Sequence, residues 1–199
     1  MKLLTIILAT VATFTLTTAP SALAVSEFHG TTTGLVDLEG TGEQELVFYN
    51  GNKLACSSLK GSATTTSKVA PSISFLATYS GCEAFGAKST VTTGGITFVI
   101  IGVSFLFIVG SSDQFVITSA VDKCSVAIIN GGNNTTLKSI TYANKSNGTI
   151  EGKSEISGIE YEVNSASAHT ICGTAKERYI GKLIGSSIAR LVGGTIKVE

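Results

Sequence analysis

The sequence of 199 residues predicts an all-β fold, an antiparallel β-sandwich stapled by disulfides. Short segments rich in β-branched and aromatic residues alternate with turn signals built from Gly, Asn and Ser, which is typical of all-β folds. Only 14% of the residues are charged, 22 are glycines, and stripes of helical period flanked by Glu and Lys are absent. Four cysteines supply the means to cross-link such a fold.

The first 24 residues predict a secretory signal peptide. Lys2 supplies a positive charge, residues 3–16 form an apolar run, and Ala22 and Ala24 are the small residues of an A-x-A cleavage site. The apolar run is shorter than the ~20 residues that a membrane-spanning helix needs. We therefore expect a mature chain of residues 25–199 that is secreted or held in the cell envelope, without an integral membrane segment.

The first part of the mature chain contains a clear hairpin signal. Residues 45–49 lead into Asn50-Gly51 and residues 53–56 lead out, and both turn residues tolerate positive φ. A later strand begins after Pro71 and is expected to end at residues 80–82. The strands expected in this part are 27–31, 35–39, 45–49, 53–56, 73–79 and 89–93.

The stretch from Ile96 to Val109 is the most apolar part of the mature chain. It is too short and too rich in Ile, Val and Phe for a membrane-spanning helix. We interpret it as two buried strands hinged near Gly102, because a continuous apolar run indicates that both faces are covered. If it is exposed instead, it predicts self-assembly or contact with a membrane.

The remaining residues continue the β pattern. A helix start at residues 175–178 is weakened by Gly181 and Gly185, so residues 178–192 are interpreted as a strand pair that ends at 195–198. A faint echo between the regions after Cys56 and Cys124 suggests two packed β modules with a boundary near residue 110 as an alternative to one domain. The other strands expected here are 114–118, 124–129, 138–142, 149–156 and 159–163.

The four cysteines are expected to be disulfides because the chain is expected to be exported. The chain has no C-x-x-C pair and only two histidines, so the sequence predicts no metal site. Cys172 with the nearby His169 is a weak candidate for a nucleophile and its base. The four positions allow three pairings, between which spacing does not choose: Cys56, Cys82, Cys124 and Cys172.

The sequence predicts no catalytic or cofactor-binding residues. There is no G-x-S-x-G motif, and the aspartates at 37, 113 and 122 do not form a calcium loop. Glu160 and Glu162 share one face of a strand, as paired carboxylates of a glycosidase can, but a solvated face is the expected reading. A net charge of zero argues against a nucleic-acid partner. The Asn-x-Ser/Thr sequons at 133, 134, 144 and 147 are interpreted as turns.

Three stretches carry a resemblance to a family. Residues 55–58, the Y-S-G-C-x-A-F-G stretch at 79–86, and residues 159–163 ahead of Cys172-Gly173 resemble small secreted proteins of unknown function from actinobacteria. Members of that family often carry two further cysteines that this chain lacks. The resemblance therefore implies pairing between neighbours, Cys56–Cys82 and Cys124–Cys172. These bridges would close loops of about 27 and 49 residues and contribute roughly 3.5 to 4 kcal/mol each.

Together these observations predict an exported, non-catalytic β protein with a binding or surface-structural role and no cofactor. One alternative is a secreted hydrolase whose site is assembled from distant residues. The other is a self-assembling or membrane-contacting protein that uses the stretch from Ile96 to Val109.

Overall fold

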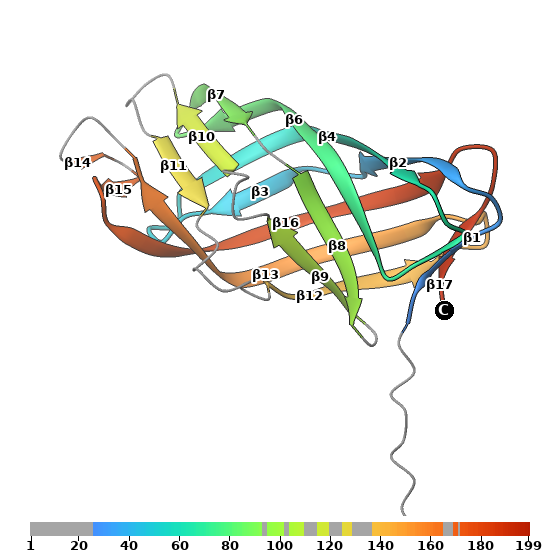
Figure 1. Ribbon diagram of the computed structural model, residues 1–199. Coiled ribbons are helices and arrows are strands. Elements are labelled where there is room, and N and C mark those ends of the chain that lie inside the picture. Colours follow the sequence, from blue (N-terminus) through green and yellow to red (C-terminus); the bar gives the residue numbers. More distant parts are fainter. Residues whose placement is uncertain are drawn as a thin grey trace, which may run out of the picture.

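A computed structural model describes residues 26–92, 95–101, 104–109, 115–119, 125–128, 137–164, 169–170 and 172–199. Every regular element within these ranges is a β-strand (Figure 1). The first eight strands are β1 (Phe28–Gly30), β2 (Gly34–Gly40), β3 (Gln44–Val47), β4 (Lys53–Thr65), β5 (Val69–Ala70), β6 (Ser72–Ala84), β7 (Ala87–Thr92) and β8 (Gly95–Ile101). The others are β9 (Ser104–Val109), β10 (Phe115–Ser119), β11 (Ser125–Ile128), β12 (Leu137–Asn144), β13 (Ile150–Val163), β14 (His169–Thr170), β15 (Gly173–Thr174), β16 (Arg178–Leu191) and β17 (Ile196–Val198).

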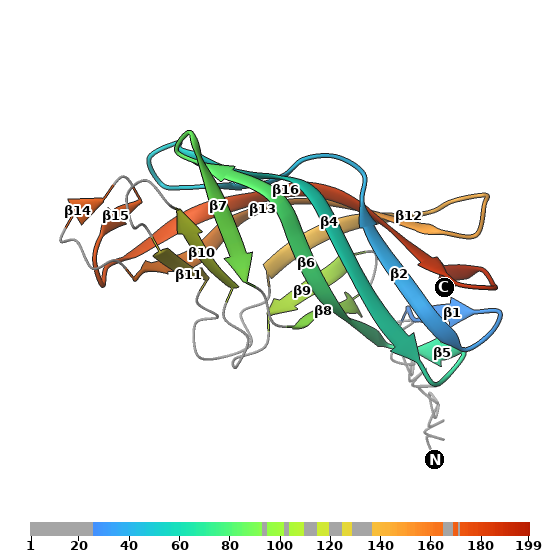
Figure 2. The same ribbon diagram turned by 90° about the horizontal axis from the view of Figure 1, so that it is seen from above.

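Twelve of the strands form one antiparallel sheet that closes on itself. Its pairings run β6–β8–β9–β12–β13–β16–β2–β4 and return from β4 to β6. A second circuit, β6–β7–β10–β11–β13–β16–β3–β4, returns through the same β4–β6 pairing. The long strands β4, β6, β13 and β16 belong to both circuits, so the molecule is an elongated closed sheet with two halves stacked end to end (Figures 1 and 2).

Pairs of shorter strands occupy the positions between the long ones. β7 and β8 follow one another along β6, because the pairs Cys82↔Ser89 and Ser72↔Val99 belong to one uninterrupted register. β2 and β3 both pair with β16 and β4 in the same way. Each half therefore has eight strand positions, a number at which side chains just fill the interior or leave room for one small ligand.

A three-stranded sheet of order β17-β1-β5 lies at one end of the molecule (Figure 2). Its pairs include Phe28↔Val198 and Phe28↔Ala70, and Phe28, Ile196 and Val198 are buried. We call this end the terminal end. The opposite end carries the β3–β4 and β6–β7 turns and the small β14–β15 pair, and we call it the aromatic end for the rings described below.

Glycines allow the long strands to bend midway between the two ends. At Gly158, whose φ is +84°, the register of β13 against β16 shifts between Ser157 and Ile159, which is a bulge. At Gly81, whose φ is +60°, β6 kinks beside Ser57 of β4, and an added Cβ would lie 2.1 Å from the Ser57 Oγ. A bulge changes which residues of a strand face inward, so buried side chains can point to the interior on both sides of it.

The all-β antiparallel fold is confirmed, and so is the hairpin at Asn50-Gly51. The two layers expected of a sandwich are opposite walls of one closed sheet, and strands from both sides of residue 110 contribute to it. A module boundary near residue 110 stays a prediction. The predicted signal peptide, with Ala22 and Ala24, lies outside the described residues.

Three details of the expected strands are wrong. β6 does not end at residues 80–82 but continues to Ala84, because Gly81 kinks the strand without ending it. Residues 149–156 and 159–163 are one strand, β13, interrupted only by the bulge at Gly158. Residues 178–191 form one strand of 14 residues and no strand pair, since β16 is held between β13 and β2/β3 along its length.

The apolar stretch from Ile96 to Val109 forms two strands, β8 and β9, as predicted, and these strands pair with each other. The predicted burial of its side chains and the hinge at Gly102 lie outside the described residues. Among the described residues, no helix has the length and apolar character needed to cross a membrane.

Candidate functional site

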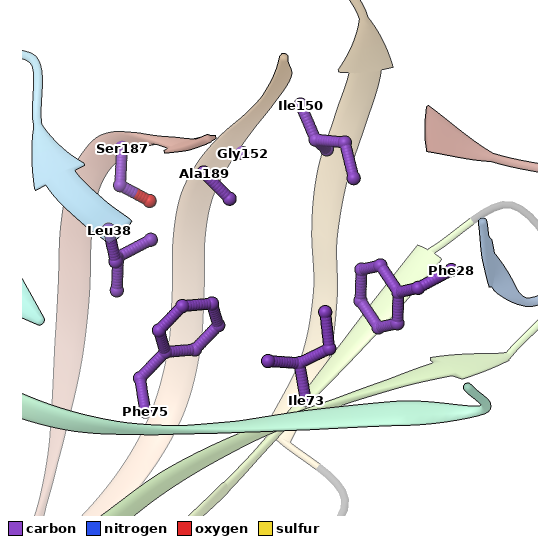
Figure 3. Close-up of a pocket in the computed structure, with 8 residues that line it drawn as sticks. All are labelled: Phe28, Leu38, Ile73, Phe75, Ile150, Gly152, Ser187 and Ala189. Carbon is purple, nitrogen blue, oxygen red and sulfur yellow. The ribbon is translucent and has the colours of Figure 1, made fainter. Parts of the chain in front are cut away.

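The interior of the closed sheet contains an apolar cavity next to the terminal end. Its volume is about 20 Å³, slightly more than the space that one water molecule needs. Figure 3 shows the lining side chains pointing into a common space from several strands. They come from β1, β2, β6, β13 and β16: Phe28, Leu38, Ile73, Phe75, Ile150, Gly152, Ser187 and Ala189.

The cavity exists because its two walls differ in side-chain size. β13 and β16 contribute three small residues, Gly152, Ser187 and Ala189, beside the larger Ile150, and Gly152 pairs directly with Ser187. β6 on the other side contributes Ile73 and Phe75. The small side chains of β13 and β16 do not reach the bulky side chains of β6, so a space remains. The Ser187 hydroxyl is the one polar side-chain group among the eight lining residues. An apolar site of this kind favours an apolar occupant over water.

The three-stranded sheet covers the cavity at the terminal end. Phe28 of β1 lines the cavity, while His29 pairs with Lys197 and lies 3.7 Å from the Glu199 carboxylate. The backbones of Glu27 and Glu199 exchange two further hydrogen bonds, of 2.6 and 3.0 Å. The cover is thus held mostly by backbone pairing of the first and last described strands.

Asn144 closes the outer edge of β17. Its Nδ2 donates to the carbonyl of Val198 and its Oδ1 accepts from the Val198 amide, both at 2.8 Å. Ile196 N–H donates to the Gly148 carbonyl at 2.9 Å, which continues this edge. The sequons at Asn144 and Asn147 therefore stand at a structured turn, as expected, and those at 133 and 134 lie outside the described residues.

The middle of the interior is held by a disulfide and by a buried amide. Cys56 and Cys82 face each other across β4 and β6 with a Cα–Cα distance of 3.9 Å, and both are buried. Gln44, also buried, donates through Nε2 to the carbonyls of Gly42 and Ser186. The side chain of Gln44 lies over Gly185, where an added Cβ would be 2.1 Å from its Oε1.

The aromatic end is packed with rings that we call the aromatic cluster, Phe48, Tyr49, Phe85, Tyr161 and Tyr179. Phe48 stacks on Phe85 at 5.3 Å between ring centroids and meets Tyr161 edge-on at 5.4 Å. Tyr179 lies between Tyr161, at 5.8 Å, and Tyr49, at 4.3 Å. Stacked and edge-to-face pairs of this geometry contribute about 0.5–1.5 kcal/mol each beyond the area they bury.

Tyr161 is the buried centre of the cluster. Its hydroxyl oxygen accepts a hydrogen bond from the Tyr49 amide at 3.2 Å, which ties the β3–β4 turn to the core. Burial of the phenol raises the pKa of Tyr161 to about 12, because the charged form would lose its hydration. The ring stays neutral near physiological pH.

Charged side chains lie on the outer surface in pairs. Lys53 contacts Glu43 and Glu45, and its hydrogen bond lowers the pKa of the Glu45 carboxyl. Hydrogen bonds from Lys145 and Lys182 likewise lower the pKa values of Glu151 and Glu155. Arg190 lies 3.2 Å from Glu39, beside an outer groove of about 490 Å³ that Asp37 also lines. Exposed pairs of this type are worth little stability.

The structure describes the side chains of four residues that the sequence offered as candidates for catalysis or metal binding: Asp37, Glu160, Glu162 and Cys172. Glu160 is exposed, while Glu162 lies 3.4 Å from Arg178, so both follow the expected solvated face of β13. Cys172 is disulfide-bonded and so is not a thiol nucleophile, and the side chain of His169 lies outside the described residues. Asp113 and Asp122 also lie outside them. In the described part of the chain, no three His, Cys, Asp or Glu side chains gather as for a metal ion.

The predicted Cys56–Cys82 bridge is confirmed. Cys172 is buried, and its predicted partner, Cys124, lies outside the described residues, so the second pairing stays a prediction. The sequence did not single out the cavity residues or the aromatic cluster. Alternation within each strand could have placed side chains such as Leu38 and Phe75 on an inner face, but only closure of the sheet shows which of them meet.

Comparisons with known proteins give no further constraint. No family model matches the chain, and neither the curated proteins nor the solved structures include a match. The resemblance to secreted actinobacterial proteins therefore stays a prediction.

Proposed function

We propose that this protein is an exported, non-catalytic binding protein that holds a small apolar molecule inside its closed sheet. The observation that carries the proposal is the apolar cavity next to the terminal end. The ligand would lie between the small wall of β13 and β16 and the bulky side chains of β6. A closed sheet with eight strand positions commonly has an interior suited to one small ligand, and this support is an analogy of architecture.

The size of the cavity restricts the ligand unless a side chain moves. A volume of about 20 Å³ accepts a group of methyl size. Phe28 is the lining residue held by the shortest segment, a strand of three residues whose pairing with β5 extends over two residue pairs. Displacement of the Phe28 ring would enlarge the cavity toward the size of an aromatic ring or an alkyl chain, so we infer a ligand of that class with at most one polar group, facing Ser187.

Export is supported by the predicted signal peptide and by the disulfide. Structural disulfides such as Cys56–Cys82 form and persist in oxidising compartments outside the cytosol. A secreted or envelope location is therefore part of the proposal. The alternatives, a hydrolase or a self-assembling protein that uses β8 and β9, predict different results in the experiment below.

The test is a titration of the mature protein with N-phenyl-1-naphthylamine, followed by its fluorescence, and with xenon, followed by its ¹²⁹Xe chemical shift. We expect saturable binding of both probes at one site. Ala189→Phe fills the cavity from β16 and should weaken binding of both probes roughly tenfold or more, since tenfold corresponds to about 1.4 kcal/mol. Phe28→Ala removes the cover residue and should strengthen binding of the naphthylamine.

Leu76→Ala is the matched control. Leu76 follows the cavity residue Phe75 in β6, but it points outward and is 67% exposed. It should bind both probes like the unmodified protein. Equal binding by the Ala189→Phe and Phe28→Ala variants would contradict the proposal, as would failure of the unmodified protein to take up either probe. Binding that grows without saturation, and with assembly of the protein, would favour the alternative based on β8 and β9.

A further inference from the structure

The aromatic end carries a second feature that the interior cavity does not explain. We propose that the exposed ring of Tyr49 is a stacking platform for a pyranose sugar, bordered by the carboxylate of Glu177. Tyr49 follows β3 at the aromatic end, whereas the cavity is lined by Phe28 of the terminal end, so this site does not depend on the proposed apolar ligand. It would give the protein a carbohydrate-binding activity.

Tyr49 is held in place although half of it is exposed. Its side chain is 52% exposed, yet its ring stacks on Tyr179 with a centroid distance of 4.3 Å and an interplanar angle of 19°. Its amide donates to the buried hydroxyl of Tyr161 at 3.2 Å. Tyr179 covers one face of the ring and about half of Tyr49 remains exposed, so the sugar would stack on the other face.

Tyr179 is itself fixed from three sides. Its hydroxyl accepts a hydrogen bond from the Thr174 amide at 2.9 Å and donates to the Glu177 carboxylate at 2.7 Å. Its ring occupies the space beside Gly173, where an added Cβ would lie 2.4 Å from the Tyr179 Cε2. Gly173, with φ of +131°, therefore both shapes the turn and makes room for the ring.

A rigid exposed aromatic ring is a feature of recognition surfaces. Tyrosine offers a large contact area with few rotatable bonds, so little conformational entropy is lost when it binds. Tyr49 has already lost that freedom through its stacking and its backbone hydrogen bond. The exposed half of Tyr49 contacts solvent and not the core, so fold stability alone does not require it.

The polar surroundings select the class of ligand. The Glu177 carboxylate borders the stacked pair, because it accepts a hydrogen bond from the Tyr179 hydroxyl. The exposed Asn52 lies in the turn that follows Tyr49. A wholly apolar partner would strip water from the Glu177 carboxylate without replacing its hydrogen bonds. A pyranose has a C–H face that suits the negative face of an aromatic ring, and hydroxyls at its edge that donate to a carboxylate.

The experiment measures binding of three defined probes, cellohexaose, maltohexaose and chitohexaose, by NMR signals of the tyrosine rings and by calorimetry. The chain has no tryptophan and five tyrosines, so ring signals at the site are few. We expect saturable binding of at least one probe, with shifts of the Tyr49 and Tyr179 signals. Tyr49→Ala should weaken that binding roughly tenfold or more, as loss of a central aromatic contact does.

Two variants serve as controls. Tyr49→Phe keeps the stacking surface and should retain binding. Ile180→Ala removes a neighbouring side chain that is 61% exposed, and it should also retain binding if the ring and not general surface hydrophobicity recognises the sugar. Circular dichroism melts of each variant establish that it is folded, and naphthylamine uptake by Tyr49→Ala should match that of the unmodified protein. The proposal is overturned if none of the three probes binds saturably, or if Tyr49→Ala binds as well as the unmodified protein.

Discussion

The two halves of the interior share the strands β13 and β16 but are filled in different ways. Toward the aromatic end these strands carry Tyr161 and Tyr179, whose rings stack on each other, and Tyr161 meets Phe48 edge-on. Toward the terminal end they carry Gly152, Ser187 and Ala189, and a cavity remains. The two halves share the four long strands β4, β6, β13 and β16, so we attribute the space left in one half to the smaller side chains that β13 and β16 carry there.

The largest expected effect is in the packed half. Tyr161→Ala should lower the free energy of unfolding by about 3–5 kcal/mol, because it removes the centre of the aromatic cluster and leaves a cavity. Chemical denaturation with urea measures this value. Ala189→Gly, a truncation on the same wall in the other half, should cost much less. Equal losses for the two variants would show that the halves do not differ in packing.

The next effect concerns the bridge at the junction of the halves. Cys56 and Cys82 are 26 residues apart in sequence, and loss of their bridge should reduce stability by about 3.5 kcal/mol in the chain-entropy account. The double variant Cys56→Ala/Cys82→Ala should melt at a markedly lower temperature in a calorimetric scan. Reductant should lower the melting temperature of the unmodified protein at least as far, and an unchanged melting curve would contradict this expectation.

A matched pair of glycine substitutions compares the halves more finely. At Gly181 an added Cβ would lie 2.7 Å from the Val47 carbonyl oxygen, so Gly181→Ala should destabilise by about 1–3 kcal/mol. At Gly152 the nearest atom would be the Ile140 Cγ2 at 3.5 Å, an ordinary contact. Gly152→Ala should therefore be neutral or stabilise by about 0.4–1 kcal/mol through the unfolded chain. We expect the urea midpoint of Gly181→Ala to fall below that of the unmodified protein, and the midpoint of Gly152→Ala to stay equal or rise.

The smallest effect is confined to alkaline pH. Folding raises the pKa of Tyr161 from its ordinary value of 10.0 to about 12, so between these values the unfolded chain has lost a proton that the folded chain still holds. The stability that this tyrosine contributes is complete below pH 10 and falls as pH rises toward 12. Urea midpoints measured at pH 9, 10 and 11 test the direction, and Tyr161→Phe should flatten this part of the curve.

Local patterns predicted most of the strands. The alternation of residues 45–56 around Asn50-Gly51 gave the β3–β4 hairpin, and the apolar stretch around Gly102 gave β8 and β9. The Cys56–Cys82 bridge followed from the family resemblance. These features depend on neighbours in sequence or on a short motif, which is why one chain was enough to predict them.

The errors and omissions have a common physical origin in contacts between distant residues. Gly181 and Gly185 weakened the helix prediction and led to a strand pair in place of the single strand β16. In the structure they face Val47 and Gln44, and those contacts leave no room for a side chain. Closure depends on pairs such as Ser187↔Gly40, which join opposite ends of the sequence and leave no local pattern. Both the cavity and the stacked pair Tyr49–Tyr179 arise from this closure, so the sequence did not indicate them.

The amide of Asn144 has a consequence for how molecules of this protein meet one another. A strand at the margin of a sheet normally offers its backbone groups to any other chain with a matching strand, and growth of fibres can begin there. At Val198 both groups are already taken by one side chain that imitates the missing strand. A single side-chain amide therefore leaves Val198 with no backbone group for a second chain to pair with, at the place where the beginning and the end of the fold are joined.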